Sequence, residues 1–393
     1  MTRPTILVTG ATGKIGSAVV TQLRQLGWPV RALVHRIDPR SERLRREGAE
    51  VVKGDLFDVE QLVDSMRGTS RAFYLPPWHP HMLHSGVSFA VAAQEAKLEA
   101  IVGLSQWLAS PSHPSLATRQ NWLVDRVFSM VPGVAHVTVN PGFFADNSLR
   151  LIGFAAHLGL FPMPLDPGRN APPSNEDIAR VIVAGLTDPA KHAGKTYRPT
   201  GPILLDAGEM AAILSRVLGR RVRHVALPMW MFLKALRALG PSFGIDAFQQ
   251  TGLRHYMKEH QRGTFELGAP TDDVREVTGT DPEDFETIAR RYAALPEARR
   301  SAWNTLKAGW DFLRIGVMPA YDLDAFERRQ QHPLVDRPRL AIDAPEWRRE
   351  HRVASVSDAQ SASERVLAGS ACTMADSSGP THGQLPGSPA SVT

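Results

Sequence analysis

The N-terminal stretch that decides the fold is residues 5–16, TILVTGATGKIG, in which a short apolar run leads into glycines at positions 10, 13 and 16. Early glycines at a strand-to-helix turn let backbone N–H groups approach a pyrophosphate, and the last lets the helix pack closely on the sheet. The partly positive helix N-terminus then faces the anion. Strand, glycines, helix and second strand follow in this order within the first 34 residues, which favours nucleotide binding over an ordinary turn.

The pattern that opens with this stretch continues to about residue 147. Short apolar runs, mostly β-branched, occupy residues 6–8, 30–34, 51–52, 71–75, 101–104 and 135–139, and several are separated by segments long enough for crossover helices. Such alternation predicts six parallel strands with helices on both faces. We therefore expect an α/β fold, a Rossmann-type doubly wound parallel sheet.

Beyond residue 150 the alternation weakens. Ser174 opens a helical run, residues 196–198 are a strand candidate, and further helices are expected around 209–218 and 229–239. We expect a NAD(P)-binding domain over 1–150 and a smaller helix-rich substrate or cap unit over 151–297 that shares some elements with it. A helical extension over 298–350 and a disordered tail rich in Ser, Ala, Gly and Pro over 351–393 would follow.

Composition excludes several classes of protein. The 393 residues are 43% hydrophobic with a formal net charge of +5, and their arginines are scattered, so nucleic-acid binding is not expected. The one cysteine, Cys372, excludes an intrachain disulfide and a cysteine-rich zinc site. No apolar stretch approaches 18 residues, and strand-like sequence begins at Thr5, leaving no room for a signal peptide. We expect a cytoplasmic protein with no membrane partner.

The end of the second predicted strand distinguishes the two nicotinamide cofactors. An NAD site usually has an acidic residue there, but this chain has Arg36, whose guanidinium suits a 2′-phosphate. NADP(H) is therefore favoured over NAD(H). The alternative is that the arginines hereabouts form the solvated face of a short helix, which we expect for some of those at 40, 43, 45 and 46. Asp55, after the third strand, is expected either to bind the adenine or to cap the next helix.

Taken together, residues 9–16, 30–36, 54–56 and 140–147 resemble the NmrA-like family of atypical short-chain dehydrogenase/reductases. The segments around 176–179, 186–189 and 194–197 match the same pattern, and the resemblance covers roughly residues 4–295. It implies a Rossmann fold and binding of NADP(H). Members of the family include quinone reductases and other NADPH-dependent reductases, as well as redox sensors that bind NADP(H) without turnover.

The resemblance also implies positions for the cofactor. The pyrophosphate would lie among Gly10, Thr12, Gly13, Lys14, Ile15 and Gly16. Arg36 would bind the 2′-phosphate, and the adenine would lie by Asp55 and Leu56. The ribose would be flanked by Leu75, Pro76 and Pro77, and the nicotinamide approached by Ser105, Pro141, Gly142 and Phe143. Asn140 stands where the family usually has an arginine, which weakens any role transferred to that side chain.

The usual catalytic pair of short-chain dehydrogenases, Tyr-x-x-x-Lys, is missing. The chain has no tyrosine between Tyr74 and Tyr197 and no lysine between Lys97 and Lys191. Three substitutes are candidates for catalytic roles: Ser105 as a hydrogen-bond donor to a carbonyl, His113 as a proton donor, and Asn121 as a ribose ligand. The alternative for His113 is a solvent-exposed residue without function.

No metal site is expected, because the histidines at 79, 81 and 84 have no accompanying carboxylate pair or cysteine. We expect them to cover the cofactor or to face water.

The favoured function is that of an NADPH-dependent oxidoreductase that reduces a small quinone-, enone- or carbonyl-type substrate without the Tyr-x-x-x-Lys pair. Hydride transfer depends mainly on orientation, so the missing tyrosine argues more against alcohol oxidation than against reduction. The alternative is a non-catalytic NADP(H)-binding sensor that acts through a protein partner.

Overall fold

A computed structural model describes residues 3–351 and contains a seven-stranded, entirely parallel sheet. The strand order is β3-β2-β1-β4-β5-β6-β8. The strands are β1 Thr5–Val8, β2 Val30–Val34, β3 Glu50–Lys53, β4 Thr69–Tyr74, β5 Ala100–Leu104, β6 Ala135–Val139 and β8 Thr196–Tyr197. The six strands expected from the sequence are confirmed, and the fold is the expected Rossmann-like α/β arrangement.

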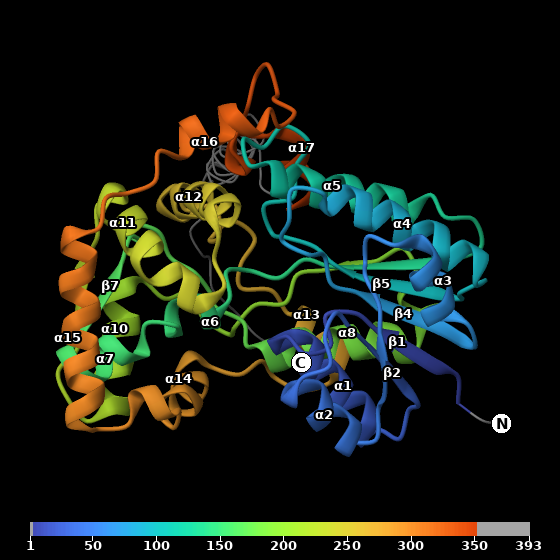
Figure 1. The fold of residues 1–393 in the computed structure, drawn as a ribbon, viewed down its shortest axis with the longest axis horizontal. Helices are drawn as coiled ribbons and strands as arrows, with labels where there is room; N and C mark the ends of the chain where they lie inside the picture. Colours follow the sequence, from blue (N-terminus) through green and yellow to red (C-terminus); the bar gives the residue numbers. More distant parts are fainter. Residues whose placement is uncertain (1–2, 352–393) are drawn as a thin grey trace, which may run out of the picture.

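Helices cover both faces of this sheet (Figure 1). One face carries α1 Lys14–Gln25, α2 Pro39–Arg46, α8 Asn175–Thr187 and α13 Asp273–Thr278. The short α9 Pro189–His192 follows α8 and contacts it and β6. The other face carries α3 Val59–Met66, α4 Met82–Glu95 and α5 Leu116–Ser129. Because successive strand residues point to opposite faces, Ile6 and Val8 join the core under α1 and α8, while Leu7 joins the core under α4 and α5.

The first unit takes residues from beyond position 150. Helix α8 packs along α1, and β8 pairs with β6 as the edge strand of the sheet. Ser174 caps α8, since its side chain accepts a hydrogen bond from the N–H of Asp177. Residues 174–197 therefore complete the nucleotide-binding architecture.

The smaller unit is built around a two-stranded parallel sheet of β7 Leu160–Met163 and β9 Arg223–Ala226. Its helices are α6 Ala145–Leu149, α7 Ile152–Leu158, α10 Ala207–Leu218, α11 Met229–Leu239, α12 Ala247–Gln261 and α14 Phe285–Ala293, with a 3₁₀ turn η1 Gly240–Phe243. The helices expected near 209–218 and 229–239 are present, whereas its two strands were not expected. One core joins these elements to Trp107 and Phe143 of the first unit, so the two units share a packed boundary.

The extension contains α15 Ala302–Val317, α16 Leu323–Gln330 and α17 Pro345–Glu350, with 3₁₀ turns η2 Pro296–Ala298 and η3 Ala341–Asp343. Helix α15 lies at the outer edge of the smaller unit, against α7 and α11 (Figure 1). The chain then returns to the first unit, where Trp347 Nε1 donates to the carbonyl of Trp107 at 2.6 Å. The tail expected over 351–393 lies outside the described residues except for His351. Within residues 3–351, no helix combines the length and apolar character that crossing a membrane requires.

Candidate functional site

The glycine loop between β1 and α1 needs glycine at two positions. Gly10 has a φ of +58°, and a Cβ there would lie 2.5 Å from Cδ2 of Leu75. A Cβ on Gly16 would lie 2.2 Å from the carbonyl oxygen of Gly10. Gly13 begins α1 without a side-chain cap, so no side chain occupies the amides that point out of the helix N-terminus. The loop therefore has the geometry of an anion cradle.

A cavity of about 190 Å³ lies where β1, β2 and β3 end. Its lining includes four residues assigned to the cofactor, together with strand-end neighbours: Gly10, Thr12, Leu33, Val34, His35, Gly54, Asp55 and Leu56. Asp55 accepts a hydrogen bond from the N–H of Phe57 at 3.0 Å, but α3 is capped by Asp58, which accepts from the N–H of Gln61. The helix-cap alternative for Asp55 was therefore wrong.

Arg36 follows the last residue of β2 by two positions and is exposed. Among residues 3–351 its side chain forms no hydrogen bond or ion pair. The arginines at 40, 43 and 45 differ, because they pair with Asp38, Glu47 and Glu42 on or beside α2. These three form a salt-bridged helix surface. Arg36 follows His35 of the cavity lining and, among the described residues, keeps its charge without an ion pair.

The loops after β4 and β6 connect this cavity to a second one. The N–H of Leu75 donates to Oγ1 of Thr9 at 2.8 Å, which holds the start of the β4 loop against the glycine loop. Pro76 and Pro77 are half-buried and lead to Trp78. After β6, Pro141 and Gly142 are buried and Phe143 packs against His260 and Phe265. Trp78 and Phe143 both line the second cavity.

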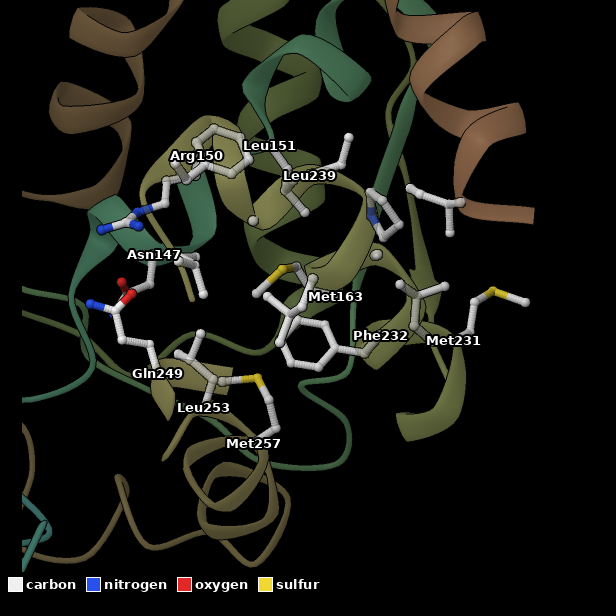
Figure 2. A pocket seen from close by; sticks show the side chains of 18 of the residues that line it. Asn147, Arg150, Leu151, Met163, Met231, Phe232, Leu239, Gln249, Leu253 and Met257 are labelled. Atoms are coloured by element: carbon white, nitrogen blue, oxygen red, sulfur yellow. The ribbon is translucent and has the colours of Figure 1, made fainter. Parts of the chain in front are cut away.

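This second cavity, of about 260 Å³, lies mainly in the smaller unit and is mostly apolar. Among the described residues that line it, Arg150 is the one with a charge, and the clearly polar side chains are those of Arg150, Asn147 and Gln249. Figure 2 shows these three together on one side, with Met163, Phe232 and Met231 toward the other. The cavity therefore suits a molecule with an apolar body and one polar end.

Asp146, on α6, links the glycine loop to this cavity. Its carboxylate accepts hydrogen bonds from Lys14 and from the hydroxyl of Tyr292, and pairs with Arg150 at 3.1 Å. Burial opposes ionisation of Asp146, but Arg150 and the two hydrogen bonds outweigh it, so the pKa of this carboxyl is lowered. Burial of the Tyr292 hydroxyl and the negative charge of Asp146 raise the pKa of Tyr292. One carboxylate thus joins a cofactor-loop lysine to the charged residue of the apolar cavity.

Ser105 stands directly after β5 and is buried. Its hydroxyl donates to Oδ2 of Asp125 on α5 at 2.5 Å. Burial raises the pKa of the Asp125 carboxyl to about 7, with the Ser105 hydrogen bond opposing the shift. A group that titrates near neutrality therefore contacts the serine proposed to approach the nicotinamide.

His113 is fully buried, so the expectation of a solvent-exposed loop residue was wrong. Its Nε2 lies 3.1 Å from Oε1 of Glu259, and its Nδ1 accepts from the N–H of Ser115. Glu259 is also fully buried and accepts from Thr264 Oγ1 and from the N–H of Ala341 in the extension. Both ring nitrogens of His113 are engaged in this structural network, which leaves none to protonate a substrate.

Asn121 is buried on α5 and lines neither cavity. Ile15 is also buried, in the core between the sheet and α1, so only its backbone can face a pyrophosphate.

Sequence reasoning missed Asp125, Asp146, Arg150 and Tyr292. Asp125 follows Asn121 by four positions, and Arg150 follows Asp146 by four, so helical spacing was an available signal for both. Tyr292 lies 146 residues from Asp146, and nothing local connects them.

Comparisons with known proteins agree with this geometry. The model of the NmrA-like family matches residues 2–105. The NAD(P)H azoreductase of Xenophilus azovorans is 31% identical over 297 residues, which are 74% of this chain and 98% of that protein. The (4-alkanoyl-5-oxo-2,5-dihydrofuran-3-yl)methyl phosphate reductase of Streptomyces griseus is 32% identical over 292 residues, 73% of this chain and 98% of that protein.

Among solved structures, the triphenylmethane reductase of Citrobacter sp. in complex with NADP(H) has a TM-score of 0.62 and 19% identity. The match covers 73% of this chain and 99% of that one, which establishes a common fold. The two sequence relatives extend the likeness to nearly their whole length, over both the nucleotide-binding and the smaller unit. The glycine loop is of the kind that the family match covers, and the two relatives share nearly their whole length with this chain. The chain therefore belongs to the NmrA-like family.

Proposed function

We propose that the protein is an NADPH-dependent reductase that delivers hydride to a small quinone-, enone- or carbonyl-type acceptor held in the apolar cavity. The observation that carries the proposal is the connection from Lys14 through Asp146 to Arg150, which joins the phosphate cradle to the polar end of that cavity. The azoreductase and phosphate-ester reductase relatives support a reductase by their names.

The residues present fit a bound NADPH. A Cβ at Gly10 or Gly16 would fill the cradle. The carboxylates nearest in sequence to Arg36 pair with the other arginines of α2, so they do not occupy its guanidinium. NADPH would supply the hydride, two electrons in all. Arg36 would donate two parallel hydrogen bonds to the 2′-phosphate of NADPH. NADH has no 2′-phosphate and would not receive them.

The acceptor would lie with its apolar body against the methionine and phenylalanine side chains of the cavity and its polar end toward Arg150, Asn147 and Gln249. Arg150 stays protonated and cannot act as an acid, but its positive charge would stabilise an oxygen that gains negative charge. Asp146 would hold that guanidinium in place.

Ser105 is proposed as the hydrogen-bond donor at the reacting end, in place of the missing tyrosine. When Asp125 is protonated, its carboxyl can donate to Oγ of Ser105, which frees the serine hydrogen for the acceptor. When Asp125 is ionised, it takes the serine hydrogen for itself, as the 2.5 Å contact allows. The protonation state of Asp125 would then govern whether Ser105 can donate.

The test is NADPH oxidation by the full chain, followed by absorbance, with a panel of quinones, enones and azo compounds. We expect turnover with several of them. Ala235→Trp, which fills the cavity from α11, should abolish turnover while NADPH binding is kept. Ala212→Trp on the exposed face of α10 is the matched control and should have no effect. Tight NADPH binding without turnover across the panel would overturn the reductase and favour the sensor.

A further inference from the structure

Helix α15 exposes a continuous row of large apolar side chains. Among residues 3–351 the side chains of this row face away from the smaller unit, while Ala308 on the opposite side is buried. Their exposed fractions lie between 64 and 84%, and they are Trp303, Leu306, Trp310, Leu313 and Val317. We call these five residues the α15 stripe.

The stripe is large for a surface without a partner. Its spacing of three and four residues places every member beside the next on one helix face. Two tryptophans exposed by about two-thirds, with three aliphatic residues, present about 600 Å² of apolar surface, and contiguous patches of this size mark interaction sites.

One side of the stripe is lined by positive charge. Lys307 and Arg314 lie seven residues apart along the same edge of α15, and Arg300 precedes the helix. Lys307 pairs with Asp311 on its own helix, Arg300 donates to the carbonyl of Leu218, and the side chain of Arg314 has no partner among residues 3–351. The edge therefore keeps a net positive charge.

The opposite edge of the stripe consists of Ala302, Gly309 and Gly316. A Cβ at either glycine would meet nothing within 4 Å among the described residues, and Lys234 Nζ donates to the carbonyl of Gly316 at 2.6 Å at the end of this edge.

From these observations we propose that α15 docks on a phospholipid bilayer that contains anionic lipids, with the stripe at the interface and the cationic edge among the headgroups. Tryptophan favours this depth, because its ring is apolar and its N–H can reach water. Arginine and lysine beside an apolar helix face bind anionic headgroups.

A second copy of the chain fits the stripe less well. An antiparallel pairing of two α15 helices would set one cationic edge against the other. A parallel pairing would bring Trp303 and Trp310 each against its own copy, at heptad positions where two-stranded coiled coils favour β-branched residues.

The sequence-based expectation of no membrane partner rested on the absence of a spanning stretch, and an interfacial helix needs none. The proposal is independent of the proposed reductase activity.

The test is sedimentation of the full chain with vesicles of phosphatidylcholine alone or with 30% phosphatidylglycerol. We expect binding to the anionic vesicles. Trp303→Ser/Trp310→Ser should lower the partition at least about tenfold. Arg314→Gln should lower it about fivefold on anionic vesicles only. Leu26→Ser/Met130→Ser, which removes two exposed apolar residues from the first unit, should bind like the wild type.

A second measurement guards against misfolding. Trp303→Phe/Trp310→Phe should still bind, but the part of the tryptophan fluorescence that brominated lipid chains quench in the wild type should be lost. Absence of wild-type binding, or equal binding by the double serine variant, would overturn the proposal. So would a wild-type dimer in light scattering that the serine variant converts to monomer without any vesicle binding, since the stripe would then pair with its copy.

Discussion

Replacing Asp125 by asparagine should remove a pH dependence from the protein. The folded state raises the pKa of Asp125 from 3.8 to about 7, so it holds a proton that the unfolded chain has already released. The contribution of protonated Asp125 to the free energy of unfolding is therefore complete below about pH 4 and is lost progressively as the pH rises to about 7. Asparagine carries no proton to release, and its amide can donate to Ser105 in place of the protonated carboxyl.

The size of the effect follows from the shift. Three pKa units correspond to about 4 kcal/mol, and solvent screening at this partly exposed side chain lowers the expected value to about 2 kcal/mol. Wild type and Asp125→Asn should have similar free energies of unfolding near pH 4.5. At pH 8 the variant should be more stable by about 2 kcal/mol.

Two assays measure this difference. Urea unfolding between pH 4.5 and 8, followed by circular dichroism, should give a difference between the two proteins that grows with pH. If Ser105 is the hydrogen-bond donor in reduction, kcat/KM of the wild type should also fall above pH 7, whereas that of Asp125→Asn should stay level. Ser105→Ala should lower turnover most below pH 7, and its difference from the wild type should shrink above pH 7, where ionised Asp125 already holds the serine hydrogen. If the free energies of unfolding of wild type and variant run parallel from pH 4.5 to 8, Asp125 does not hold the extra proton in the folded state. If their turnover profiles run parallel, that proton has no role in catalysis.

Three other perturbations address the cofactor site and the extension. Arg36→Glu should weaken the binding of NADPH by at least about tenfold in fluorescence titrations, while the affinity for NADH changes little. Equal losses of affinity for both cofactors would show that Arg36 does not bind the 2′-phosphate. Arg43→Glu is the matched control. Gly16→Ala should abolish NADPH binding, because its Cβ would lie 2.2 Å from the Gly10 carbonyl oxygen, so normal affinity in the same titration would contradict the cradle. Trp347→Ala should lower the free energy of unfolding in urea by about 3–5 kcal/mol, since this side chain is buried, and a change under 1 kcal/mol would mean that the extension is only loosely attached.

The sequence predicts the first unit well because its strands are buried on both faces. Runs such as residues 30–34 and 135–139 are mostly apolar and largely buried, broken only by Arg31, His136 and Thr138. The glycines at 10 and 16 are required by close contacts with Leu75 and with the Gly10 carbonyl oxygen. Strands β7 and β9 were missed because β7 contains Pro162 and β9 is largely exposed, so neither has the pattern of a core strand.

The site is less predictable because its decisive partners are distant in the chain. The burial of His113 depends on Glu259, 146 residues away, and a Pro/Ser loop gives no sign of such a partner. Arg150 can be recognised as a cavity residue only when α11 and α12 are in place around it, since they make the cavity apolar. What the sequence predicts is the cofactor, through local geometry, and what it leaves open is the acceptor, which tertiary packing defines.

The return of the extension to the first unit has a mechanical consequence. Arg119 donates to the carbonyl of Pro333, the N–H of Arg339 donates to Ser112, and the ring of Trp347 stacks on His351 beside Trp107. The extension therefore ties the first unit to the smaller unit, and without it the two would be joined only through their shared boundary. A hinge rotation between them would have to break these contacts, of which those of Trp347 are buried, so amides on both sides of the boundary should exchange with solvent together, as one cooperative body.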